Sequence, residues 1–217
     1  MDVPVNRPET VDYNSPYHFP RGADPGTLVH AVFEHLDFVN SDNHYLHSHS
    51  EKQLRAHGID SQWAPALCQL VRNTLDTPLI ENGFALAGLD RKDRLDEMEF
   101  HFPVESLQAD KLVTLLRDYQ VIGAEDDLVF DCLDGYMKGF IDLTFRYEDR
   151  WYIADYKSNH LGYESADYGA EALEAAMQHH RYDLQYLIYA VALRRYLGTR
   201  LPDFDSCLLY TSPSPRD

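Results

Sequence analysis

Two alternating apolar segments joined by a short polar turn constrain the fold of this chain more than any other feature. They lie in residues 138–159, KGFIDLTFRYEDRWYIADYKSN, and the turn is EDR. Alternation of apolar and polar residues is typical of β-strands, so we expect a hairpin with strands over 137–147 and 150–157. A turn centred between its first two residues places Asp142 opposite Asp155.

The predicted hairpin gathers two carboxylates and one ammonium group. Directly opposed side chains have Cβ atoms ~4.5–5.5 Å apart, and two carboxylates that close repel unless a shared proton or a cation neutralises them. Lys157 follows Asp155 by two residues and shares its strand face. Such an oxygen-rich patch suits Mg²⁺. A cross-strand surface salt bridge is the alternative. Core-type neighbours of the acids count against it: Ile141, Leu143, Ile153 and Ala154.

Helical periodicity precedes and follows the strands. The pattern predicts a helix opened by Thr27 as its N-cap, then a polar His-rich loop over 40–50. The elements expected after this loop are helices over 51–57, 63–76, 108–119, 166–180 and 182–198, and strands over 95–103 and 127–133. Helices, then compact strands, then helices indicate an α/β or α+β fold.

Composition divides the chain into three parts. Residues 1–25 are rich in proline and are expected to form a linker or arm, and residues 26–205 form the folded domain. Residues 206–217 end in SPSPRD, which fits either a disordered tail or non-native sequence after Asp205, translated from a cloning or sequencing adapter. Sequencing the source DNA across codon 207 distinguishes the two.

Charge and cysteine usage exclude several functional classes. With 19 Lys+Arg against 36 Asp+Glu, the net charge of −17 argues against unaided DNA binding, which depends on cations. The 3 cysteines are far apart and form no C-x-x-C pair, which argues against a disulfide framework, a zinc site and an iron–sulfur cluster. The chain shows no signal peptide and no apolar run of ~20 residues, so we expect a cytoplasmic protein.

The hairpin and the sequence after it resemble a known nuclease family. GFIDLTFRYEDRWYIADYKSNHLG, then AMQHHRYDLQYLIYAVALRRYL, is similar to the nuclease domain of RecB-type exodeoxyribonuclease V beta subunits, in the PD-(D/E)xK nuclease superfamily. PRGADPGTLVHAVFEHLDF and RLDEMEFHFPV extend the resemblance over roughly residues 16–205. It implies a restriction-endonuclease-like core, with a mixed central sheet flanked by helices and an N-terminal helical segment.

The resemblance also implies an activity and its partners. The expected reaction is Mg²⁺-dependent hydrolysis of DNA phosphodiester bonds during processing of DNA ends for recombinational repair. The expected substrates are linear ends and single strands released by unwinding, with RecC and RecD as partner subunits.

Matching positions receive the family's metal and catalytic roles. By resemblance, His30 is a metal-ligand histidine, Asp142 and Asp155 are metal-binding carboxylates, and the backbone carbonyl of Tyr156 is a further ligand. Lys157 matches the catalytic lysine.

Three further positions match more loosely. Glu97 matches an additional active-site acid, and Glu99 shares its strand face. Gln185 and Tyr189 fit a Q-x-x-x-Y element, and their i, i+4 spacing puts them on one helix face, where they could orient the lysine or contact DNA.

Two other functional classes stay open. The chain lacks a G-x-x-x-x-G-K-[ST] phosphate loop, so it carries no helicase motor and is either a fragment or a freestanding relative. A catalytically silent structural or interaction module of a helicase–nuclease complex is the main alternative. A metal-binding regulator using His44, His47 and His49 is weaker, because these histidines are expected in a solvated loop without cysteines.

Overall fold

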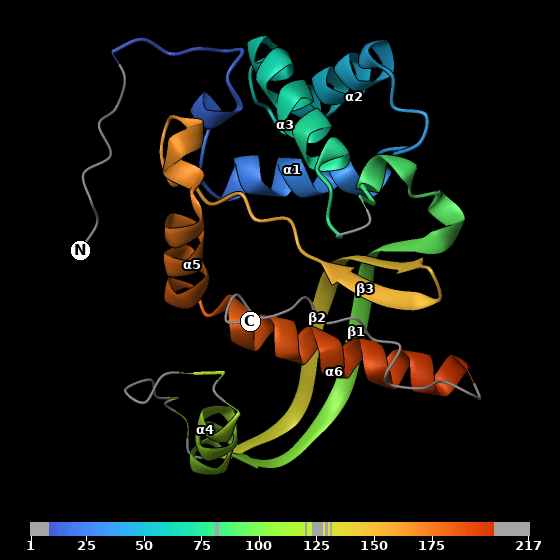
Figure 1. Cartoon of the computed structure of the whole chain (residues 1–217), viewed down its shortest axis with the longest axis vertical. Coiled ribbons are helices and arrows are strands. Elements are labelled where there is room, and N and C mark those ends of the chain that lie inside the picture. Colours follow the sequence, from blue (N-terminus) through green and yellow to red (C-terminus); the bar gives the residue numbers. More distant parts are fainter. Residues whose placement is uncertain are drawn as a thin grey trace.

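The fold combines an N-terminal group of helices with a long, narrow sheet. The computed structural model describes residues 9–80, 83–119, 121–122, 128, 130 and 132–201. Figure 1 shows α1, α2 and α3 packed together, β1 and β2 running away from them, and α6 lying across these strands. The bounds are α1 Ala23–His35, α2 Asn43–Ala56, α3 Ala64–Asp76, β1 Arg94–Gln108, α4 Ala109–Asp118, β2 Cys132–Tyr147, β3 Arg150–Ala154, α5 Ala170–His179 and α6 Tyr182–Arg200. The predicted α/β class with an N-terminal helical segment is confirmed.

The first helix begins earlier than the sequence pattern predicts. α1 starts at Ala23 after Gly22, whose φ of 119° favours glycine. Thr27 is therefore not the N-cap: its hydroxyl donates to the Ala23 carbonyl oxygen at 3.0 Å, inside the helix. Pro25 is tolerated because a first-turn N–H has no partner within the helix, and the acid of Asp24 suits the positive end of the helix dipole.

The predicted His-rich loop is wrong, because these residues lie in α2. The Asp42 side chain caps this helix by accepting from the Tyr45 amide at 2.8 Å. Leu46 and Leu54 point into the core despite the polar composition around them. His44 and His47 are exposed, and His49 faces α1 with Nε2 3.1 Å from the Val32 carbonyl oxygen. Among the described residues, the histidines of α2 belong to no cluster of potential metal ligands.

The predicted hairpin and its register are confirmed. β2 and β3 pair antiparallel, from Tyr147 with Arg150 to Leu143 with Ala154. The turn residues Glu148 and Asp149 have φ of 46° and 62°, as a two-residue turn matched to the twist of the strands requires. β3 ends at Ala154, earlier than the predicted residue 157.

All strand pairs in the described part of the chain are antiparallel. The sheet order is β1-β2-β3, so no parallel pair of the expected mixed sheet lies among the described residues. The strands expected over 127–133 and 137–147 are continuous as β2 from Cys132 onward. Residues 127, 129 and 131 of that prediction lie outside the described part.

Two apolar cores meet at one rung of the β1–β2 ladder. Leu143 packs with the N-terminal helices, whereas Ile141, two residues away, packs with α6. Residues two apart in a regular strand share a face, so a change of core between Ile141 and Leu143 marks the point where the strand departs from this regular pattern. Asp142 lies between these two residues, and its neighbour across the ladder is Glu97, with a positive φ of 49°. Both acids therefore sit where the sheet passes from one core to the other.

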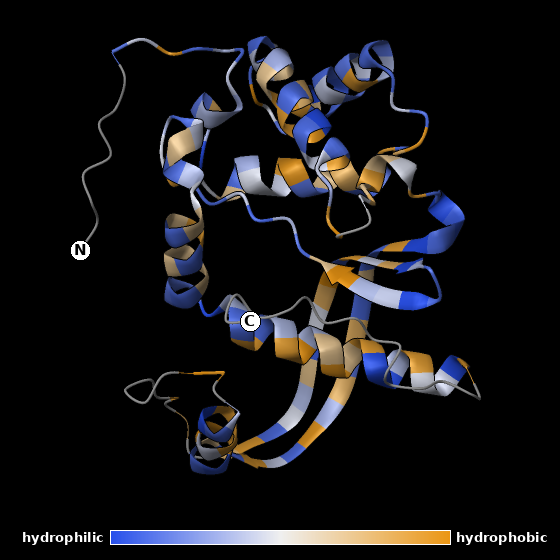
Figure 2. Cartoon of the chain, in the orientation of Figure 1, coloured by the Kyte–Doolittle hydropathy of each residue, from blue (hydrophilic) through white to orange (hydrophobic). Residues whose placement is uncertain are grey.

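Two residues separate the C-terminal helices, His180 and the left-handed Arg181. The expected helix over 166–180 is a 3-10 turn, Ser165–Tyr168, followed by α5. Arg181 has φ 56° and directly precedes α6. Figure 2 shows polar and apolar residues interspersed along α6, and none of the described helices has the length and apolar character that crossing a membrane demands.

The predicted outer segments are only partly covered by the described residues. Phe19 of the predicted arm is 8% exposed and joins the N-terminal core, and the Tyr13 ring lies 4.5 Å from the Trp63 ring. Residues 1–8 and the whole tail over 206–217 lie outside the described part. The domain boundaries and the origin of the tail stay predictions.

Acidification is expected to destabilise the α1–α2 contact through His49. Burial lowers the pKa of His49, with Lys52 and His35 nearby as positive neighbours when charged. His49 therefore binds a proton more readily in the unfolded chain than in the folded one. Its contribution to the free energy of unfolding is fully present above the ordinary pKa of about 6.5, and it is lost as pH falls through the lower pKa of the folded state. Urea unfolding between about pH 7.5 and 5 should show wild type losing stability relative to His49→Gln. His44→Gln, at an exposed position of α2, is the control and should track wild type.

Candidate metal and catalytic site

Three side chains from three elements converge at the junction of the two cores. His30 of α1, Glu97 of β1 and Asp142 of β2 each offer a ligand atom, and these atoms all lie within 4.8 Å of one another. His30 Nδ1 is 3.4 Å from Asp142 Oδ1 and 3.9 Å from Glu97 Oε1. The three groups could hold one metal ion.

Local structure explains how these side chains meet. Leu28 and Val32 on α1 are fully buried, and they orient the helix so that His30, between them, faces the strands while remaining partly exposed. Glu97 has a left-handed backbone, which costs a non-glycine residue on the order of 1–3 kcal/mol. Strain of this kind is concentrated at functional sites.

Burial and mutual repulsion make this cluster electrostatically unfavourable without a cation. Burial, followed by the charge of Asp142, raises the pKa of Glu97. Burial raises the pKa of Asp155, and the Asp142 charge adds to that effect while Lys157 opposes it. The hydrogen bond to Asp142 raises the pKa of His30. A bound cation would favour the charged acids and the neutral imidazole.

Asp155 contacts Lys157 and Gln185. Its carboxylate forms an ion pair with Lys157, and its Oδ1 accepts from Gln185 Nε2 at 3.4 Å. It is not among the three residues whose ligand atoms lie within 4.8 Å of one another. Glu97 belongs to the group with His30 and Asp142, and the metal-binding role expected of Asp155 stays a prediction.

Gln185 links the lysine to α6. Lys157 Nζ donates to Gln185 Oε1 at 2.7 Å, and Gln185 Nε2 donates to the Tyr189 hydroxyl at 2.6 Å. Burial raises the pKa of Tyr189 to about 12, so its hydroxyl stays protonated. The i, i+4 spacing predicted for the Q-x-x-x-Y element thus brings Gln185 to Lys157 and both side chains to Asp155.

Tyr156 supports the site through its amide and its ring. Its backbone N–H donates to Asp142 Oδ2 at 2.7 Å, and its ring stacks on Phe33 with centroids 4.2 Å apart. Burial raises the pKa of the Tyr156 phenol. The amide contact was not expected from sequence, and the ligand role of the carbonyl stays a prediction.

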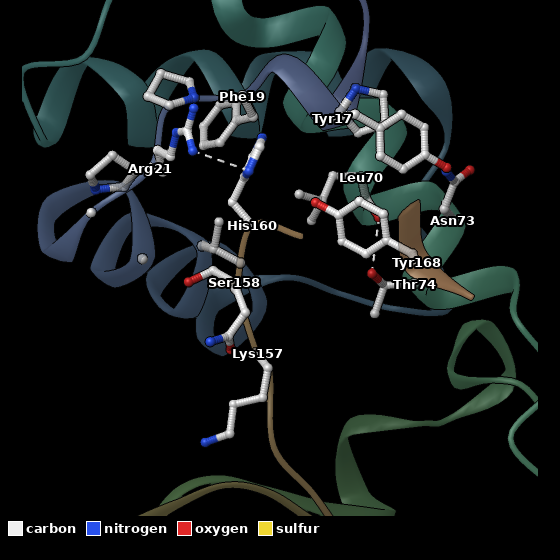
Figure 3. Close-up of a pocket in the computed structure, with 17 residues that line it drawn as sticks. Tyr17, Phe19, Arg21, Leu70, Asn73, Thr74, Lys157, Ser158, His160 and Tyr168 are labelled. Atoms are coloured by element: carbon white, nitrogen blue, oxygen red, sulfur yellow. Dashed lines mark hydrogen bonds between the residues drawn. The ribbon is translucent and has the colours of Figure 1, made fainter. Parts of the chain in front are cut away.

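A cavity of about 220 Å³ lies beside the segment that carries the lysine. Figure 3 shows its lining, with Arg21 bonded to His160 and Lys157 extending away from both. Gly26 allows α1 to approach this segment, because a Cβ there would lie 3.2 Å from Ser158 Oγ. Lys157 is one of the lining residues, and its ammonium contacts Asp155 and Gln185.

Sequence reasoning missed one residue of this site. The Tyr182 ring lies under Lys157 Nζ, at 4.1 Å from the ring centroid. An aromatic residue at the start of a predicted helix is an ordinary packing position, so nothing in the pattern singled it out.

Comparisons with known proteins identify the family to which the chain belongs. Residues 8–213 match the profile of the PD-(D/E)XK nuclease superfamily. RecBCD enzyme subunit RecB of Escherichia coli K12 is 45% identical over 194 residues, covering 88% of this chain and 16% of that protein. The RecB subunits of Haemophilus influenzae and Mycolicibacterium smegmatis are 37% and 35% identical, over 86% and 94% of this chain and 15% and 21% of those proteins.

The matched region is a small part of each relative. The chain spans about a sixth to a fifth of the length of these three RecB subunits. Because the superfamily profile covers nearly the whole chain, the chain belongs to the PD-(D/E)XK nuclease superfamily.

Proposed function

We propose that this chain is a Mg²⁺-dependent nuclease domain that hydrolyses DNA phosphodiester bonds. The ligand atoms of His30, Glu97 and Asp142 lie within 4.8 Å of one another, and Lys157 is ion-paired with Asp155; this arrangement is the observation that carries the proposal. One to two carboxylates with water and substrate phosphate are the usual ligands of Mg²⁺ in enzymes that act on phosphates. A site with one histidine and two carboxylates could also bind Mn²⁺, and cleavage assays with each metal distinguish Mg²⁺ from Mn²⁺.

The donor set fits a divalent cation. Two carboxylates and one imidazole nitrogen lie close together, and burial, followed by the nearby charge of Asp142, raises the pKa of Glu97. His30, Glu97 and Asp142 would hold the ion, with Asp155 and the Tyr156 carbonyl as further candidates. When bound, such an ion polarises the scissile phosphate and lowers the pKa of water.

The chain's own groups supply orientation and positive charge. The Tyr156 amide fixes one oxygen of Asp142, which leaves Oδ1 toward His30. Lys157 would orient the attacking water, or donate to the phosphate oxygens as negative charge develops in the transition state. Gln185 and Asp155 hold the ammonium next to the acids.

Net charge bears on how DNA reaches the site. A chain of charge −17 binds phosphates weakly unaided, although the segment over 176–201 is locally basic. The relatives are named as subunits of the RecBCD enzyme. We therefore propose that a longer chain and the RecC and RecD subunits deliver linear ends or unwound single strands for recombinational repair in the cytoplasm. The silent-module alternative is disfavoured, since Asp142, Asp155 and Lys157 are all present.

Substitution of Asp142 or Lys157 should abolish DNA cleavage without unfolding the chain. Asp142→Asn and Lys157→Ala each remove a charged group that acts on the metal or on the phosphate, so the rate should fall by about 100-fold or more. The assay is release of labelled nucleotides from linear DNA, with circular dichroism as the fold check. Asp149→Asn and Lys138→Ala, at exposed positions, are the matched controls. Wild-type rates in either active-site variant would overturn the assignment.

Metal removal tests the same site independently. EDTA should stop cleavage, and Mg²⁺ should restore it and raise the thermal unfolding midpoint by binding the native state. A His30→Ala, Asp142→Asn double variant should show no such rise. An intact fold with no cleavage under any divalent metal would instead favour the silent module.

A further inference from the structure

Three groups contact the ammonium of Lys157, and one of them is an aromatic ring. Gln185 Oε1 accepts from it at 2.7 Å, and the Asp155 carboxylate forms an ion pair with it. The ring centroid of Tyr182 lies 4.1 Å from the same nitrogen. This separation is well inside the ~6 Å over which cation–π attraction acts.

The Tyr182 ring is itself fixed on several sides. Its hydroxyl donates to Asn159 Oδ1 at 2.8 Å, and its ring stacks on His180 with centroids 5.3 Å apart and planes at 17°. It is the first residue of α6, and the left-handed Arg181 turns the chain immediately before it. The ring position is therefore set by the turn between α5 and α6.

Ring contact restrains an ammonium in a way that hydrogen bonds do not. An ammonium has three N–H donors; Gln185 Oε1 accepts from one of them, and the Asp155 carboxylate forms an ion pair with the charged group. An aromatic face attracts the cation through its quadrupole and needs no directed bond. Because the ring uses no N–H donor, an N–H of the ammonium stays available to a water or a phosphate oxygen, while the ring limits where the flexible lysine stem can go.

We propose that Tyr182 is a positioning residue that holds the Lys157 ammonium against its aromatic ring, in the place from which the lysine acts. Its catalytic consequence rests on the nuclease function proposed above, whereas the ring–ammonium contact does not. The competing explanation is structural: the Tyr182 hydroxyl ties residue 159 to α6, and the ring is incidental.

Two substitutions separate these explanations. Tyr182→Phe keeps the ring and removes the bond to Asn159, whereas Tyr182→Leu removes the ring and keeps an apolar side chain. Tyr196→Leu is the matched control, because Tyr196 lies on the same helix with its ring 3.8 Å from Arg200 instead of Lys157.

Nuclear magnetic resonance of lysine side chains tests the contact without activity. The chain has five lysines, so ¹³Cε-lysine labelling yields few signals, and Lys157→Arg assigns the one of interest. A group above a ring is shielded, so the Lys157 Hε signals should lie upfield of the others. Tyr182→Phe and Tyr196→Leu should retain this shift, and Tyr182→Leu should remove it. An unshifted Lys157 signal in the wild-type chain would overturn the contact, even if the chain cleaves DNA.

Cleavage kinetics test the consequence. Tyr182→Leu should lower kcat by about 3- to 30-fold, the range of a cation–π contact, with KM within about twofold of wild type. Tyr182→Phe should recover kcat to within about twofold. Equal losses in Phe and Leu variants would assign the effect to the hydroxyl tie, and an unchanged Leu variant would remove Tyr182 from the mechanism. Absence of cleavage in wild type would refute the nuclease proposal alone, since the resonance shift decides the contact.

Discussion

The arrangement of this domain depends on an acid kept almost out of water. Asp142 is 8% exposed, between the fully buried Ile141 and Leu143. A buried carboxylate is costly unless hydrogen bonds or charges compensate it. The Tyr156 amide and the His30 imidazole supply part of that compensation, while Glu97 and Asp155 add further negative charge nearby.

The site exists because two cores meet there. Packing of α1 against the sheet brings His30 to Asp142, and packing of α6 brings Gln185 and Tyr189 to Asp155. The strained backbone of Glu97 lies on the same rung, where the sheet changes from one core to the other. Each core therefore contributes to the geometry of the acids as well as to stability.

Lys157 shows how long side chains depend on distant elements. Its backbone position follows from the hairpin, but two partners of its ammonium, Gln185 and Tyr182, come from the first turns of α6. Four rotatable bonds would allow the ammonium to reach many places. Gln185 and Tyr182 restrict that range, and they can do so only because Arg181 starts α6 at this point.

Local features of the sequence were sufficient for the hairpin. Strand alternation and turn residues act over a few positions, so the register from Tyr147 and Arg150 to Leu143 and Ala154 was predictable without knowledge of the fold. The polar helix α2 was not, because its stability comes from the Asp42 cap and from Leu46 and Leu54 packing on distant residues.

Resemblance pointed to the site residues, and the tertiary structure decided how they group. The sequence alone placed Asp142 and Asp155 together and put Lys157 beside them. It could not show that Glu97 takes a left-handed backbone opposite Asp142. It also gave no sign of Tyr182. These details follow from packing between elements far apart in the chain, and no local pattern encodes such contacts.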